Sequence, residues 1–315
     1  MKPNLIRPYF QKVEILFLIF VCSLTQFHAE ENYTTKEGLY TNLTEALKNP
    51  NEVRILDLSR SKLKILPKEI GQLQNLQILN SENNQLTTLP KEIGKLQNLQ
   101  ELHLQNNQLT TLPEEIGQLQ NLKVLHLNNN QLTTLPEEIG KLQNLQELNL
   151  FVNRLNILPK EIGRLQNLQE LYLSLNRLTI LPEEIGQLES LRKLSLGGKN
   201  KPFTILPKEI TQLQNLQELD LVGNQLTTLP ENIGQLQRLQ TLYLGNNQLN
   251  FLPNKVEQLQ NLQELGWDHN QLATLPEEIK QLKNLKKLYL HNNPLLSEKI
   301  EKIRKLLPQC TVYFE

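Results

Sequence analysis

Cysteine is nearly absent from this chain, with two in 315 residues, and so few exclude a disulfide scaffold. An excess of charge of either sign is also absent, because 33 Lys and Arg residues balance 33 Asp and Glu residues. A polyphosphate ligand would be expected to require a basic stripe, and the sequence shows none. We therefore expect no nucleic-acid partner.

Groups of catalytic residues are missing as well. No serine, cysteine or carboxylate group stands at the spacing of a nucleophile and its base. Cys310 lies near the C-terminus without an obvious base. We predict no enzymatic activity, no catalytic residue and no cofactor.

A hydrophobic run long enough to cross a membrane is the third absence. The apolar residues 15–24 fall short of the ~20 that a spanning helix needs, so we expect no transmembrane span. Basic residues precede this run, and a polar step to Ala29 follows it. This order predicts that residues 1–29 are a signal peptide and that the chain is exported, to the periplasm, the cell surface or the medium.

Cys22 offers an alternative interpretation of this segment, as a lipidated residue. Val21, however, is a poor substitute for the small residue expected just before a lipidated cysteine. We therefore expect cleavage near Ala29, which leaves Cys310 as the single cysteine of the mature chain.

What the sequence does contain is a repeat, LPxEIGxLxNLxxLxLxxNxLxx. Its ten copies follow at 23-residue steps, apart from one 25-residue unit from Leu181, and begin at Leu66, Leu89, Leu112, Leu135, Leu158, Leu181, Leu206, Leu229, Leu252 and Leu275. In the unit 89–111, the alternation of Leu102 and Leu104 predicts one short strand with these leucines buried. A lone unit is too small to fold, so stacked neighbours must complete the core.

Three other repeat positions have predictable roles. Asn107 should turn inward and bond to backbone groups that would otherwise be buried without partners. Pro113 suits the first position of a short helical return segment, and Gly117 is expected to end that segment in a left-handed conformation.

These residues resemble the leucine-rich-repeat superfamily. The near-invariant LPxEIGxLxNL half looks like the short-repeat bacterial branch that is abundant in pathogenic spirochaetes. The resemblance covers roughly residues 40–315. It implies an α/β fold class, a right-handed solenoid (horseshoe) with a concave parallel β-sheet and short helical or 3-10 convex segments. It also implies protein–protein recognition far more often than catalysis.

The domain organisation follows from where the repeat begins and ends. We predict a signal peptide (1–29), an N-terminal cap (30–52), a solenoid (53–296) and a C-terminal cap (297–315). The caps should contain a helix at 41–48, a helix from Ser297 and an edge strand at 311–314.

Outward residues of successive strands should form columns spaced about 4.8 Å apart. Phe151, Val152, Tyr172 and Leu175 are apolar where most repeats carry polar residues, and an exposed apolar patch usually marks a partner site. Local packing against the two-residue insertion within 197–203 is the alternative. Tyrosine is enriched at interface hot spots. The predicted protein-binding residues are therefore Phe151, Val152, Tyr172, Leu175, Tyr243 and Tyr289.

His103 and His126 are neighbours in one such column. With Glu101 they suggest a shared metal ion. Two histidines alone are a weak signal, so we expect solvated imidazoles and no metal site.

The predicted function is that of an exported, monomeric, non-enzymatic module that recognises a host or cell-surface protein through its concave face. A structural or self-associating envelope protein is one alternative. Because similar repeats occur in intracellular Ras-binding proteins, a signalling adaptor is another, should residues 1–29 not be a signal peptide.

Overall fold

The computed structural model describes residues 37–198, 203–295 and 297–314. All the repeats lie in one compact unit, Tyr40–Glu315. The predicted signal peptide and Cys22 fall outside the described residues. Within those described, no helix is both long enough and apolar enough to span a membrane.

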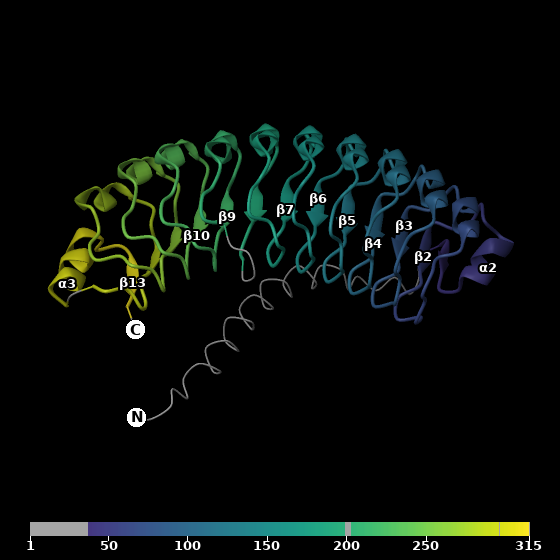
Figure 1. The fold of residues 1–315 in the computed structure, drawn as a ribbon, viewed down its shortest axis with the longest axis horizontal. Coiled ribbons are helices and arrows are strands. Elements are labelled where there is room, and N and C mark those ends of the chain that lie inside the picture. Colours follow the sequence, from purple (N-terminus) through teal and green to yellow (C-terminus); the bar gives the residue numbers. More distant parts are fainter. Residues whose placement is uncertain (1–36, 199–202, 296, 315) are drawn as a thin grey trace, which may run out of the picture. The chain divides into compact units, whose positions relative to one another are not determined.

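Each repeat contributes one short strand to a single sheet, in which the strands follow chain order (Figure 1). From β2 to β13 all neighbours are parallel, and equivalent residues pair directly, as Leu102 with Leu125. The strands are β1 (Leu39–Tyr40), β2 (Ile55–Asp57), β3 (Ile78–Asn80), β4 (Glu101–His103), β5 (Val124–His126), β6 (Glu147–Asn149), β7 (Glu170–Tyr172), β8 (Lys193–Ser195), β9 (Glu218–Asp220), β10 (Thr241–Tyr243), β11 (Glu264–Gly266), β12 (Lys287–Tyr289) and β13 (Thr311–Tyr313).

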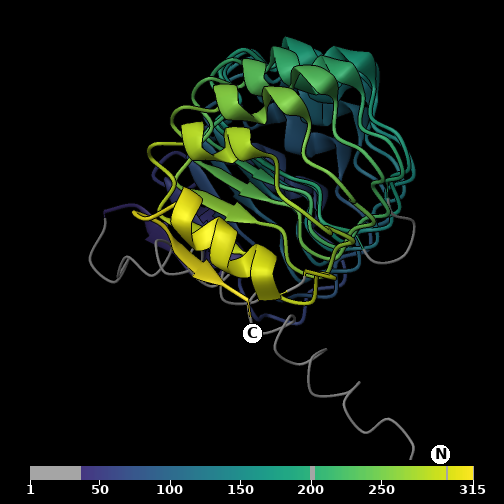
Figure 2. The same ribbon diagram turned by 90° about the vertical axis from the view of Figure 1, so that its left-hand side faces the viewer.

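The return segments are single 3-10 turns, each preceded by the proline of its repeat. Pro113 stands one residue earlier than predicted, at φ −69° just before the turn Glu114–Gln118. The turns follow the outer edge of the arc in Figure 1 and stack above the strands in Figure 2. They span Lys68–Gln72, Lys91–Lys95, Glu114–Gln118, Glu137–Lys141, Lys160–Arg164, Glu183–Gln187, Lys208–Gln212, Glu231–Gln235, Asn254–Gln258 and Glu277–Gln281. The predicted solenoid of parallel strands and 3-10 turns is confirmed.

The space between the strands and the turns is filled by the repeated leucines and isoleucines. Ile93, Leu96, Leu99, Leu102 and Leu104 are all completely buried, and the other repeats place the same positions in one continuous core. Burial of one such side chain contributes about 1.5–3 kcal/mol. The buried residues are therefore the apolar positions that the repeat pattern predicts.

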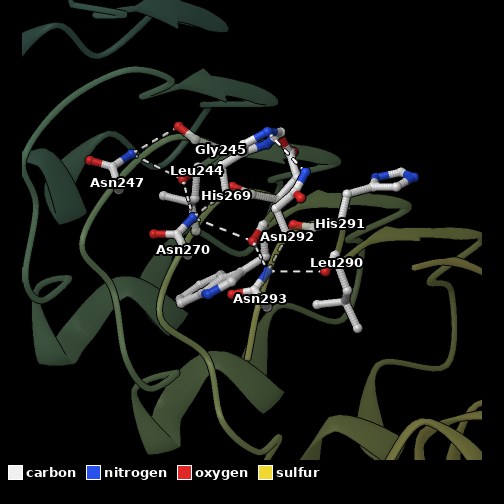
Figure 3. Close-up of polar contacts among 11 residues, drawn as sticks. Leu244, Gly245, Asn247, His269, Asn270, Leu290, His291, Asn292 and Asn293 are labelled. Carbon is white, nitrogen blue, oxygen red and sulfur yellow. Dashed lines mark hydrogen bonds and ion pairs between the residues drawn. The ribbon is translucent and has the colours of Figure 1, made fainter. Parts of the chain in front are cut away.

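The repeated asparagine turns inward, as Figure 3 shows for Asn247, Asn270 and Asn293. The amide nitrogen of Asn270 donates to the carbonyl of Leu244, in the preceding repeat, at 2.8 Å, and to that of Asp268 at 3.0 Å. Its amide oxygen accepts from the backbone N–H of Leu249 at 3.0 Å. Each asparagine thus bonds backbone groups of its own turn and of the previous repeat, which confirms the prediction.

The role predicted for Gly117 is wrong. Positive φ angles occur at Gly38 and Gly223 among the described glycines, and Gly117 is not one of them. A Cβ atom there would lie 2.6 Å from the backbone oxygen of Glu138 in the next turn. The glycine therefore allows adjacent 3-10 turns to approach closely, a requirement of packing and not of backbone conformation.

Helices close both ends of the core, near the predicted positions. Helix α2 (Leu43–Lys48) is capped by Asn42, whose side-chain oxygen accepts from the N–H of Thr44 at 2.8 Å. At the other end, α3 (Ser297–Leu306) places Ile303 in the core and β13 pairs with β12. These elements cover apolar side chains that a terminal repeat would otherwise expose.

Three irregular residues depart from the repeat inside the core. Phe203, after the insertion, replaces a repeat leucine and is 4% exposed. Ser81 and Trp267 occupy the position of Leu104 and are completely buried. The hydroxyl of Ser81 and the indole nitrogen of Trp267 lack a hydrogen-bond partner, so each replacement buries an unsatisfied polar atom.

Candidate protein-binding surface

The solvent-facing side of the sheet carries the predicted columns of side chains. Glu101 pairs with Val124, Val124 with Glu147, and Glu147 with Glu170, so the first column crosses β4 to β7. In the second column, Asn149 pairs with Tyr172 and Tyr172 with Ser195. The strand register therefore brings together residues that lie 23 positions apart or, at the insertion, 25.

The turns that follow β6 and β7 contain the clearest departure from the repeat. Val152 has φ 54° and Leu175 has φ 57°, in the left-handed region that L-residues rarely adopt. Backbone hydrogen bonds hold both residues in place. The N–H of Val152 donates to the carbonyl of Ser174 at 3.0 Å, and the N–H of Leu175 donates to the carbonyl of Gly197 at 2.7 Å. Their side chains are only partly buried.

Other repeats use residues suited to this conformation at the same place. Asparagine tolerates left-handed φ better than other L-residues, and glycine adopts it freely. The equivalent residues with positive φ are Asn83, Asn106, Asn129, Gly223, Asn246, His269 and Asn292 in the repeats, and Arg60 in the turn after β2. Valine, which is β-branched, is the least suited of all.

Tyr172 lies between these two turns in sequence and presents its ring on the second column. Its hydroxyl donates to the carboxylate of Glu170. Burial and this bond to Glu170 both raise the pKa of Tyr172. The tyrosine is therefore neutral and held against its own strand. We name Phe151, Val152, Tyr172 and Leu175 the apolar turn patch.

Tyr243 and Tyr289 do not extend the apolar turn patch. Tyr243 lies on β10 and donates to Glu264 at 3.3 Å. Tyr289 lies on β12, where its ring stacks on Tyr313 with centroids 4.8 Å apart. Strands β7 and β12 are separated by about 24 Å at the usual spacing. The six predicted residues therefore form two groups, one at β6, β7 and the turns that follow them and one on β10 and β12, where Gly266 separates Tyr243 from Tyr289 in the column.

Charged side chains around the patch are paired with one another. Lys193, on β8, lies 3.3 Å from Glu170. Farther along the sheet, Lys287 lies 2.7 Å from Glu264. Burial raises the pKa of Asp220, although Val222 and Ser195 donate hydrogen bonds to it. This part of the sheet is polar, so the apolar turn patch contrasts with its surroundings.

Three exposed isoleucines form a second apolar feature that we did not predict. Ile157, Ile180 and Ile205 belong to consecutive repeats and are 54%, 62% and 73% exposed. They precede the Leu-Pro pair of the return segment, at a position held by threonine in five other repeats: Thr88, Thr111, Thr134, Thr228 and Thr274. Comparison of the repeats at this position is the signal that would have found them.

Cys310 lies in the C-terminal cap and is half-buried. Burial raises the pKa of its thiol to about 11, so little of the nucleophilic thiolate form exists at neutral pH.

Comparison with known proteins agrees with this architecture. A family model described as a leucine-rich repeat region matches residues 33–127, 114–201 and 195–307. No curated protein matches the chain. A solved leucine-rich-repeat protein of Leptospira interrogans is 38% identical, with coverage of 89% of this chain and 100% of that one and a TM-score of 0.45.

Two receptor structures resemble the fold more closely. The plant peptide hormone receptor RGFR1, solved in complex with RGF2, is 29% identical at a TM-score of 0.65, covering 87% of this chain and 49% of the receptor. A TDR receptor is 30% identical at a TM-score of 0.75, covering 89% and 50%. The chain thus spans about half of each receptor. Such repeats generally serve protein interaction and not catalysis, and the match of the family model to most of the sequence establishes that the chain belongs to the leucine-rich-repeat family.

Proposed function

We propose that this chain is an exported module that binds a host or cell-surface protein, with the apolar turn patch at the centre of the contact. The observation that carries the proposal is the left-handed backbone of Val152 and Leu175. A receptor of the same fold that was solved with RGF2 supports protein binding in general. The order of basic, apolar and small residues in the segment before Glu30 supports export.

Asparagine suits these two backbone positions better than valine or leucine does. A left-handed conformation costs an ordinary L-residue about 1–2 kcal/mol. Full burial would offset that cost, but both side chains are only partly buried. Asparagine at either position would remove the strain, as it does in five other turns. Backbone strain of this kind collects at functional sites, and burial against a partner supplies the missing stabilisation.

The test is to restore the repeat residue at both positions. We expect Val152→Asn combined with Leu175→Asn to raise the melting temperature and to weaken partner binding by at least tenfold. The partner is first found by screening the purified chain against extracellular receptor and matrix proteins, and its affinity is then measured by surface plasmon resonance. A more stable variant with lower affinity separates a binding role from a folding role.

Two controls accompany this test. Asn106→Val places the same strain in a distant turn and should lower the melting temperature without changing the affinity. Glu137→Ala with Lys141→Ala changes exposed residues of a 3-10 turn and should change neither quantity. If the affinity is unaffected by the paired asparagine substitutions and falls with the 3-10 turn changes, the apolar turn patch is not the binding site.

Export has its own measurement. Intact-mass analysis or N-terminal sequencing of the protein from its native cells should find a mature chain that begins close to Glu30. A chain that retains Met1 and stays in the cytoplasm would contradict the proposed compartment without affecting the binding test.

The exposed isoleucines favour one alternative, self-association. Ile157, Ile180 and Ile205 lie on consecutive repeats, and contiguous exposed apolar groups commonly mark interfaces. Replacement of all three by threonine, the residue of the other repeats, should leave the fold intact. Analytical ultracentrifugation of both proteins decides: a concentration-dependent oligomer that the threonine variant lacks supports self-association, and a monomer in both cases excludes it.

A further inference from the structure

Four side chains form a continuous polar row across β4, β5 and β6. Glu101 lies 3.0 Å from Nε2 of His103, and Glu147 lies 2.9 Å from Nε2 of His126. Between them, the two histidines meet through their Nδ1 atoms at 3.2 Å. The order of the row is therefore carboxylate, imidazole, imidazole, carboxylate.

Proton positions follow from the outer contacts of this row. A carboxylate accepts hydrogen bonds, so each Nε2 carries the proton that it donates to its glutamate. A neutral imidazole has a single N–H, which leaves a lone pair on each Nδ1. Two lone pairs that face each other at 3.2 Å repel, unless a proton or a metal cation lies between them.

We propose that His103 and His126 bind a divalent transition-metal ion of the zinc type through their Nδ1 atoms. Zinc–imidazole bonds of about 2.0–2.1 Å at a tetrahedral angle place two ligand nitrogens roughly 3.3–3.4 Å apart. The observed 3.2 Å is close to this separation.

The outer glutamates give the pair the second shell of a metal site. Metal-bound histidines usually donate their other N–H to a carboxylate, which fixes the tautomer and raises the basicity of the ligating nitrogen. Both histidines have such a carboxylate, and each comes from an ordered strand.

The protein supplies only two ligands to this ion. Nowhere in the described ranges do three or more His, Cys, Asp or Glu side chains converge in a group that could hold a metal. The side chains of His103 and His126 are 11% and 17% exposed, on the solvent-facing side of the sheet. Water, or a side chain of a bound protein, completes the coordination shell.

Calorimetric titration of the untagged full chain with ZnCl₂ tests the site. The column itself provides matched substitutions, because its neighbouring positions hold Asn80 and Asn149. We expect one ion to bind and this binding to be lost in His103→Asn and in His126→Asn. His291→Gln changes a histidine elsewhere on the sheet and should bind zinc as the unchanged chain does.

The outer shell is tested by Glu101→Gln and Glu147→Gln. Each should weaken zinc binding by about 10–100-fold while both histidines remain. Circular dichroism checks that every variant is folded. Zinc should also raise the melting temperature of the unchanged chain and of neither His→Asn variant. Failure of the unchanged chain to bind zinc at millimolar concentration, or equal binding by the His→Asn variants, overturns the proposal.

Discussion

The amide of each repeat asparagine satisfies backbone groups that no solvent reaches. Asn130 donates to Leu104 and to Leu127, both at 3.0 Å, and accepts from the N–H of Leu109 at 2.9 Å. Loss of this side chain leaves the buried N–H of Leu109 without a partner, while the carbonyls of Leu104 and Leu127 keep one bond each, from Asn107 and Asn153. One residue in each repeat therefore controls the polar interior of its turn.

For this residue we predict that Asn130→Ala destabilises the fold by about 1–3 kcal/mol, the cost of leaving a buried N–H without a partner. Gln131→Ala, one residue later, trims a side chain at the surface and should have almost no effect. Urea denaturation of both variants measures the difference. Equal losses would contradict the inward role of the asparagine.

Ser81 presents the opposite case, because the native residue is the unfavourable one. Its hydroxyl is buried without a partner at a position where most repeats have leucine. Ser81→Leu should raise the free energy of unfolding by about 0.5–2 kcal/mol, as substitutions toward a repeat consensus often do. Thermal denaturation checks this, and a destabilised variant would show that neighbouring side chains already fill the site.

At the scale of elements, the 3-10 turns pack so closely that the backbone of one turn fills the space beside the glycine of the turn before it. Gly117→Ala introduces a Cβ against the backbone of Glu138, which has no rotamer to move away. We expect a loss of roughly 1–3 kcal/mol, the usual cost of overpacking. Glu114→Ala in the same turn is the control, since its side chain is exposed. A harmless Gly117→Ala would mean that neighbouring turns can separate.

Helix α3 stabilises the molecule by covering the apolar side chains of the last repeat. Ile303 is 3% exposed, whereas Lys305 lies on the outer side of the same helix. Ile303→Asp should undock α3 and expose the final leucines, and light scattering should then detect aggregation. Lys305→Asp introduces the same side chain at the surface and should remain monomeric. Aggregation of both variants would assign the effect to charge and not to the cap.

At the scale of the whole molecule, the sequence predicts whatever the repeats share. The positions of Leu102 and Asn130 were predicted correctly because the same residue type recurs at the same place in nearly all ten repeats. The role of Gly117 was predicted wrongly because a repeated glycine can be required either by a positive φ angle or by the close approach of a neighbouring segment. The sequence pattern is the same in both cases. The repeat pattern alone explains why the architecture was predictable.

The candidate site was less predictable for physical reasons. A column shows which residues are neighbours on a sheet, but Tyr172 and Tyr289, members of one column, lie five strands apart. The strain at Val152 is a property of φ, which the sequence does not display. The approach of His103 to His126 depends on rotamers set by Glu101 and Glu147. Ile157 lies outside the sheet, so the columns of strand residues do not include it.

The asparagine bonds have a consequence for mechanical load. Asn270 reaches back to Leu244 and Leu249, so each repeat is fastened to its predecessor by bonds that break together. Tension on the C-terminus would detach repeats singly, starting with the last. At 3.3–3.6 Å for each extended residue, every rupture releases roughly 75–85 Å of chain. A stretched molecule of this kind would lengthen in nearly equal steps, with the 25-residue unit as the one longer step in the record.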